Sequence, residues 1–131
     1  MSGTISVLVV EDEAILLEAY ELILGTAGYT VFTARNGIEA LEQLKKVTPD
    51  VMLLDIFMPE MDGREVLRNL DKADYPEMKI IVCSNLSDSN ASQEVLRNGA
   101  DDFVLKSSLG PMELIQLIKD KTRQRASKSE S

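Results

Sequence analysis

Short aliphatic runs alternate with longer stretches of helical period along this chain, and this alternation restricts the possible folds more than any other feature. The runs are rich in Val, Ile and Leu, as strands are. Between them, apolar residues recur at spacings of three and four, as on the buried face of a helix. Strands and helices that alternate in this way form βα units and a parallel sheet. The five predicted strands are 5–10, 29–33, 51–54, 79–83 and 102–105.

The composition of each strand predicts its position in the sheet. Strands 5–10, 51–54 and 79–83 are apolar without alternation, as expected where helices cover both faces. Strands 29–33 and 102–105 are more mixed, which predicts that they lie at the edges. We therefore expect an α/β fold of the flavodoxin-like type, a doubly wound, five-stranded parallel sheet in the order 2-1-3-4-5 with five helices. Residues 1–124 are expected to form this domain, and the polar residues 125–131 a disordered tail.

Composition excludes several classes of function. The chain has 131 residues and a net charge of −8. It has no histidine, which excludes catalytic triads and zinc sites that contain histidine. The acidic balance disfavours nucleic acid and anionic membranes as direct partners. The single cysteine, Cys83, lies in an apolar run and is predicted to be a buried hydrophobe, so no disulfide can form within the chain. No segment reaches the ~18 apolar residues of a membrane span. We expect a soluble, cytoplasmic protein.

Polar side chains follow four of the five predicted strands at the point where each strand ends. Glu11 and Asp12 follow the first strand, Asp55 the third, Ser84 the fourth and Lys106 the fifth. The carboxyl ends of parallel strands line the ligand crevice, which opens where the strand order reverses, here between the first and third strands. The five side chains are therefore expected to lie together. Each could instead be a cap, a turn residue or a surface ion pair, but four strand ends of complementary charge favour a site.

Three carboxylates in one small space repel one another, by about 4 kcal/mol for a pair at ~4 Å. A protonated carboxyl, Lys106 or a divalent cation can relieve the repulsion, and the cation does so most fully. Carboxylates with an open side toward phosphate suit Mg²⁺. The Lys106 ammonium and the Ser84 hydroxyl suit phosphoryl oxygens, and Asp55 is the best candidate for a nucleophile toward phosphorus. The expected product is an aspartyl phosphate.

The predicted site residues lie in four short segments: VVEDE (9–13), LLDIFMPEMDG (53–63), IIVCSN (80–85) and GADDFVLKS (99–107). Together these segments resemble the receiver domain of two-component response regulators. The resemblance implies a phosphorelay switch in which Asp55 accepts a phosphoryl group from a phosphohistidine of a histidine kinase or phosphotransfer protein. No turnover of an external substrate is expected. Asp12, Asp55 and the Phe57 backbone carbonyl are implied ligands of Mg²⁺, and Glu11 is implied to act mostly through a metal-bound water.

The resemblance also implies how the signal is sent. Lys106 would hold a phosphoryl oxygen, Ser84 would bond the phosphorylated product, and Phe103 would rotate inward as an aromatic switch. The surface formed by the fourth helix, fifth strand and fifth helix would then change for a downstream effector protein. The chain could be a free-standing receiver or the receiver part of a longer regulator.

Some positions depart from the family pattern. Lys106-Ser107 stands where the family usually has Lys-Pro with a cis peptide, and a cis bond before a non-proline residue costs about 2.5–4 kcal/mol. The loop after the fifth strand is therefore either strained or different in path. Glu11 replaces the commoner aspartate. Met112 stands where winged-helix relatives often carry a dimer-forming arginine, so a phosphorylation-dependent homodimer is one possibility but is not assured.

Two apolar residues lead to a prediction about rate. Phe57 lies two residues beyond Asp55, and Leu86 lies two beyond Ser84. We expect them to exclude water or to leave it unoriented, so that the phosphorylated state is long-lived. The alternative is that they only pack at the rim.

Other functions fit the sequence less well. An aspartate-nucleophile phosphatase or mutase has a second aspartate at the position of Phe57. A flavodoxin-like FMN binder would bring phosphate to Glu11 and Asp12, which would repel it. A nucleotide hydrolase would carry GxxxxGK[ST], which is missing. A non-phosphorylated receiver-like scaffold would have lost site residues, and here all are present.

Overall fold

A parallel sheet of five strands organises the molecule, as the sequence predicts. The computed structural model describes residues 4–58, 60–85 and 89–130. The strands have the predicted order β2-β1-β3-β4-β5. Their bounds are β1 (Ser6–Val10), β2 (Thr30–Ala34), β3 (Val51–Asp55), β4 (Lys79–Ser84) and β5 (Asp102–Leu105).

Five α-helices connect and cover the strands, which also agrees with the prediction. They are α1 (Ala14–Thr26), α2 (Gly37–Leu44), α3 (Gly63–Arg68), α4 (Ser89–Arg97) and α5 (Pro111–Glu130), with two short 3-10 helices, η1 (Lys72–Asp74) and η2 (Lys106–Ser108). Helix α5 continues beyond Gln124, the last residue of the predicted domain. The disorder of residues 125–131 stays a prediction. No helix in the described ranges is long and apolar enough to cross a membrane.

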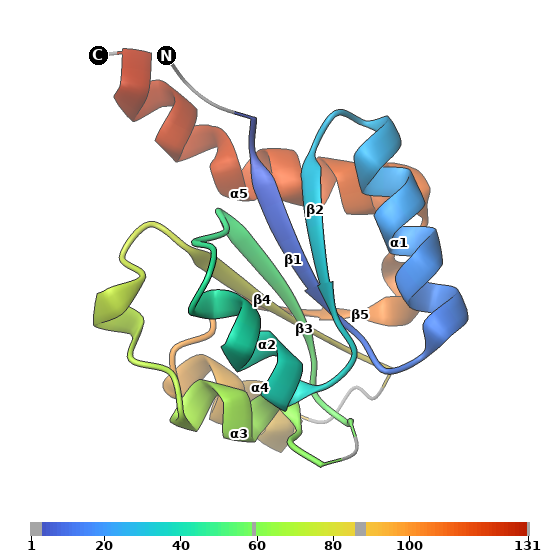
Figure 1. The fold of residues 1–131 in the computed structure, drawn as a ribbon, viewed down its shortest axis with the longest axis vertical. Coiled ribbons are helices and arrows are strands. Elements are labelled where there is room, and N and C mark those ends of the chain that lie inside the picture. The colour runs from blue at the N-terminus through green and yellow to red at the C-terminus, as the bar shows by residue number, and fades with distance from the viewer. Residues whose placement is uncertain (1–3, 59, 86–88, 131) are drawn as a thin grey trace.

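Helices cover both faces of the sheet (Figure 1). Alternate residues of a strand point to opposite faces, so Val7 and Val9 of β1 pack in a core with α1 and α5. Leu8 and Val10 pack in the other core, with α2, α3 and α4. The central strands are therefore apolar without alternation between their ends, as predicted, and polar residues stand only at the strand ends. Strands β2 and β5 are only half-buried over most of their length because they form the edges.

Cys83 lies in the core between the sheet and helices α1 and α5. It is buried, and burial is the main reason that its pKa is raised to about 12. A thiol in this environment stays protonated and packs as a small apolar group. The prediction of a buried hydrophobe is therefore confirmed.

The strand register brings the carboxyl ends of four strands to one edge of the sheet. Val10 pairs with Leu54, so the residues that follow them, Glu11 and Asp55, occupy corresponding positions. Leu105 pairs with Ser84 across β4 and β5. Lys106 follows Leu105 directly. It therefore lies at the same edge of the sheet, on the side of β4 that is away from β3.

Candidate functional site

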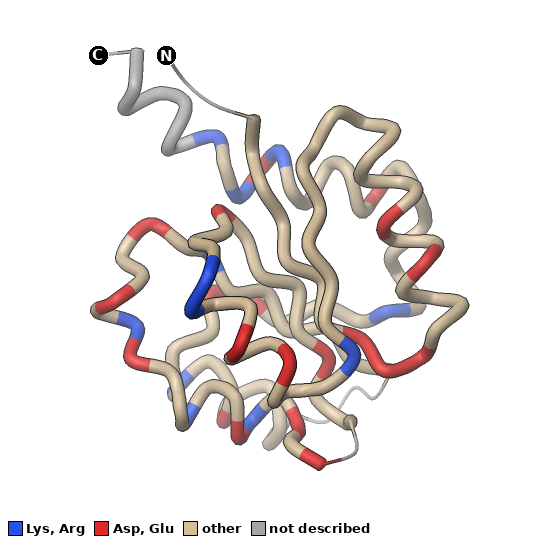
Figure 2. Tube along the Cα trace, viewed as in Figure 1, with Lys and Arg blue, Asp and Glu red and all other residues tan. Residues whose placement is uncertain are grey.

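Three carboxylates converge where β1 and β3 end. One carboxylate oxygen each of Glu11, Asp12 and Asp55 can be chosen so that all three lie within 4.8 Å of one another. Glu11 and Asp55 are buried, and Asp12 is exposed, so the cluster opens to solvent on the Asp12 side. Acidic segments gather at this edge of the sheet, after β1 and at the end of β3 (Figure 2). The chain thus brings together carboxylates that the sequence predicts to be neighbours.

Lys106 provides the positive charge inside this cluster. Its Nζ lies 2.6 Å from Oε1 of Glu11 and 3.3 Å from Oδ2 of Asp55. The side chains of all three residues are at least nine-tenths buried. A buried ammonium that bonds two carboxylates fixes both in place, because breaking such a pair leaves an uncompensated charge.

The electrostatics of the cluster shift the pKa of two of its groups. Burial, followed by the charge of Glu11, raises the pKa of Asp55 from 3.8 to about 7, although Lys106 acts in the opposite direction. Burial alone would lower the pKa of Lys106, but its hydrogen bond to Glu11 and the charge of Asp55 outweigh that effect and raise it. Lys106 therefore stays charged. Asp55, with a pKa of about 7, is partly protonated at neutral pH when no cation is bound.

Backbone contacts set the position of the acidic residues. The Glu11 N–H donates to the Ala34 carbonyl at 3.0 Å, and its Oε2 accepts from the Glu13 N–H at 3.1 Å. These bonds tie the end of β1 to β2 and to the start of α1. They hold the Glu11 carboxylate toward Lys106.

The Asp-Gly turn after β3 returns the chain close behind Asp55. The Gly63 N–H donates to the Ile56 carbonyl at 2.7 Å, and a Cβ at Gly63 would collide with the Asp55 carbonyl oxygen. Only glycine allows so close an approach. Asp62 then begins α3 through a capping box with Glu65. The turn at Asp62 and Gly63 thus supports the strand end that carries Asp55.

Three of the four remaining predicted site residues lie in or directly after strands β3, β4 and β5. Ser84 is the last residue of β4 and is buried. Phe103, in β5, is partly buried against the core that faces α2, α3 and α4. Phe57 is 46% exposed. Leu86 lies outside the described residues. The structure gives one arrangement of Ser84 and Phe103, so their switching stays a prediction.

The loop after β5 begins with a trans peptide. No cis peptide bond occurs in the described ranges, which include Lys106 and Ser107. The chain instead forms the 3-10 helix η2 at once, and the Leu109 N–H donates to the Lys106 carbonyl at 3.0 Å. The sequence left two possibilities for this loop, a strained cis peptide or a path different from the family's. The structure shows the second.

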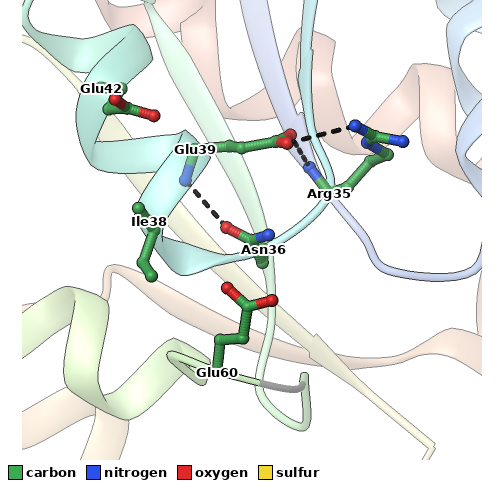
Figure 3. Close-up of a pocket in the computed structure, with 6 residues that line it drawn as sticks. All are labelled: Arg35, Asn36, Ile38, Glu39, Glu42 and Glu60. Atoms are coloured by element: carbon green, nitrogen blue, oxygen red, sulfur yellow. Dashed lines mark hydrogen bonds and ion pairs between the residues drawn. The ribbon is translucent and has the colours of Figure 1, made fainter.

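A separate hollow of about 560 Å³ lies beside this edge of the sheet. Figure 3 shows the Glu39 carboxylate at its wall, paired with Arg35 at 3.4 Å, and the Asn36 side chain accepting from the Glu39 N–H at 2.9 Å. The hollow does not include the carboxylate cluster or Lys106. The lining residues are Arg35, Asn36, Ile38, Glu39, Glu42 and Glu60.

Arg64 makes contacts that the sequence pattern does not predict. Its guanidinium lies over the Phe57 ring, 5.6 Å from the ring centroid. It also pairs with Asp62 and with Glu94 of α4, both at 3.4 Å. An arginine just after an Asp-Gly turn gives no local signal for these contacts, because they depend on how α3 packs beside α4.

Comparison with known proteins agrees with this geometry. The family described as the response regulator receiver domain matches residues 7–119. The chain belongs to this family. A chemotaxis protein CheY of Thermotoga maritima is 41% identical over 101 residues, which cover 76% of this chain and 83% of that protein. A CheY-like receiver domain of Methanospirillum hungatei has a TM-score of 0.88 at 28% identity, covering 96% of this chain and 99% of that one.

Other relatives are longer than this receiver domain. A probable transcriptional regulator ycf27 of Guillardia theta is 38% identical over 82% of this chain but only 41% of its own length. Receiver domains of two-component signalling therefore occur both alone and as parts of larger regulators. Such domains bind Mg²⁺ at an acidic cluster, and the carboxylate oxygens of Glu11, Asp12 and Asp55 are the hard donors that this ion prefers.

Proposed function

We propose that this receiver domain is a phosphorylation switch in which Asp55 accepts a phosphoryl group from a phosphohistidine of a partner kinase or phosphotransfer protein. The observation that carries the proposal is the double contact of Lys106 with Glu11 and Asp55 inside the carboxylate cluster. A merely structural ion pair would need one carboxylate. A third acid, Asp12, on the open side adds negative charge that only a cation or a proton can balance.

The transfer forms one bond and breaks another. An Oδ of Asp55 bonds to phosphorus while the phosphorus–nitrogen bond of the donor breaks, and the imidazole leaves with the electron pair. The receiver domain has no histidine, so the donor imidazole must come from outside this domain. Lys106 would hold a phosphoryl oxygen and keep the acceptor carboxylate in line.

Asp12, Asp55 and the Phe57 carbonyl would hold Mg²⁺ directly, and Glu11 would act through a bound water. When bound, the ion neutralises charge on the phosphoryl oxygens and favours the ionised form of the acceptor. The charge of Lys106 already offsets part of the rise that burial causes in the pKa of Asp55. Only the ionised carboxylate is a nucleophile, so both positive charges promote the same step.

The output would follow from movement of Ser84 and Phe103. Ser84 would bond the phosphoryl group and Phe103 would turn inward. The surface of α4, β5 and α5 would then change for a downstream protein or a second copy of the chain. Phe57 and Leu86 would slow hydrolysis by excluding or failing to orient water. We expect no turnover of an external substrate, no direct contact with nucleic acid or membrane, and a cytoplasmic location.

Intact mass spectrometry tests the central step. The protein is incubated with acetyl phosphate or phosphoramidate, with and without Mg²⁺, beside Asp55→Asn and a Glu42→Gln control that removes an exposed carboxylate. We expect one added phosphoryl mass, only with Mg²⁺, in wild type and control and none in Asp55→Asn. Uptake by Asp55→Asn, or none by wild type, would disprove the proposal. Steady release of phosphate without accumulation on the protein would favour a phosphatase instead.

A further inference from the structure

Arg64 connects the phosphoacceptor strand end to a different helix. Its guanidinium lies 5.6 Å from the centroid of the Phe57 ring. The same group pairs with Asp62 at 3.4 Å and, through its other nitrogen, with Glu94 of α4 at 3.4 Å. The ion pairs with Asp62 and Glu94 restrict movement of the guanidinium away from the ring.

Glu94 is shared between two arginines of α3. Its second carboxylate oxygen lies 3.7 Å from Arg68. Arg68 is more exposed than Arg64, with 53% against 33% of the side chain accessible. The two arginines therefore make the same helix-to-helix ion pair, but Arg64 also lies over Phe57. This difference provides a matched control within the chain.

Phe57 needs such support because it is not held by the core. The preceding residue, Ile56, is fully buried, whereas Phe57 is 46% exposed. An exposed ring two residues from Asp55 can swing between rotamers unless something fixes it. A planar guanidinium over the ring face is attracted by the ring quadrupole and limits that motion.

We propose that Arg64 is a positioning residue for the lifetime of phosphorylated Asp55: it holds the Phe57 ring at the rim of the site and links that ring to α4 through Glu94. This inference rests on the proposed function. Without Arg64 the ring moves away and water reaches phosphorus more easily, so hydrolysis of the acyl phosphate is faster. Any event that draws Glu94 away then shortens the lifetime, which makes the rate sensitive to α4.

The test measures first-order loss of the phosphoryl group after the small phosphodonor is removed, by intact mass against time. Loss of a cation–π contact at a partly exposed site corresponds to about a two- to fivefold change in rate. We expect Arg64→Ala to lose phosphate faster by that factor and Arg64→Lys to lie between Arg64→Ala and wild type, because lysine keeps the charge but not the planar guanidinium. Glu94→Gln should be faster by a smaller factor. Arg68→Ala should match wild type.

A double-mutant cycle separates positioning from a direct effect of charge. In a Phe57→Ala background, Arg64→Ala should cause no further acceleration, because the ring that it holds is gone. The same acceleration in both backgrounds would overturn the inference, as would a wild-type rate for Arg64→Ala or an equal acceleration by Arg68→Ala.

Failure of the proposed function has a different result. If wild type takes up no phosphoryl group, the proposed function fails and the lifetime role fails with it. If uptake is normal and the lifetimes are equal, only the role of Arg64 is wrong. Urea denaturation of the unphosphorylated single and double variants tests the contact itself. Additive effects of Arg64→Ala and Phe57→Ala would show that the contact is not made and would overturn the inference.

Discussion

Replacing Asp55 by asparagine should stabilise the protein at neutral pH in the absence of divalent cations. Asparagine has the size of aspartate but no charge, so the substitution removes the buried carboxylate without leaving a cavity. The pKa of Asp55 is raised from 3.8 to about 7, mainly by burial and then by Glu11. Between these two values the folded protein binds more protons than the unfolded chain. The free energy of unfolding contributed by this group therefore falls as the pH rises through the window.

The magnitude follows from the size of the shift. A pKa difference between 3.8 and about 7 corresponds to about 4 kcal/mol when the shift is complete. This is an upper bound, because Asp12 is exposed and water can reach the cluster from that side. The asparagine oxygen also pairs less strongly with Lys106 than a carboxylate does. We expect Asp55→Asn to gain about 2 kcal/mol in free energy of unfolding at pH 8 and almost nothing at pH 4.

Urea denaturation in EDTA at several pH values measures this difference. Glu42→Gln serves as the control, because Glu42 is exposed and its replacement reports the general benefit of removing one charge from a chain of net charge −8. Adding Mg²⁺ should reduce the advantage of Asp55→Asn, since a ligand that binds wild type more tightly stabilises wild type more. If Asp55→Asn in EDTA at pH 8 is no more stable than wild type after correction by the control, the argument from burial is wrong.

Two further substitutions test the support of the site. Lys106→Met should lower the free energy of unfolding by about 3 kcal/mol, because it leaves Glu11 and Asp55 buried without their cation; stability that equals wild type in urea at pH 8 would contradict this. Gly63→Ala should cost about 1–3 kcal/mol and slow phosphoryl uptake, because the new methyl group would push on the Asp55 carbonyl. Gly25→Ala is the control, since that position is helical and open and should gain up to about 1 kcal/mol. Equal effects of the two alanines would refute the steric argument.

The sequence predicts the sheet because its central strands are buried on both faces. Such strands are apolar on both faces between their ends, and five short runs separated by helical periods leave few topologies. The meeting of Glu11, Asp55 and Lys106 is predictable for the same reason, since the carboxyl ends of parallel strands share one edge. Local chemistry also indicates the turn at Asp62, because an aspartate before glycine begins both a turn and a helix.

Contacts between helices are harder to predict from sequence. The bond between Arg64 and Glu94 joins residues that are 30 positions apart, and it depends on the rotation and spacing of α3 and α4, which their short amphipathic patterns do not determine. The path after β5 is similar. The sequence shows that Ser107 replaces the usual proline, but the 3-10 helix η2 forms because the chain there can bond Leu109 to Lys106, which is a property of the folded loop.

The charge of the carboxylate cluster indicates why a stable fold keeps a buried group that is unfavourable for stability. Three carboxylates and one lysine leave a formal charge of −2 when all are ionised, in a place where charge is poorly solvated. The raised pKa of Asp55 is the response of the protein alone: one carboxyl binds a proton more readily and part of the excess charge disappears. A divalent cation balances the same −2 without a proton, and so leaves Asp55 ionised. Natural sequences break the rule against buried, unbalanced charge mainly where function requires it, and under the proposed function this imbalance is the property that would make the acceptor carboxylate depend on a cation.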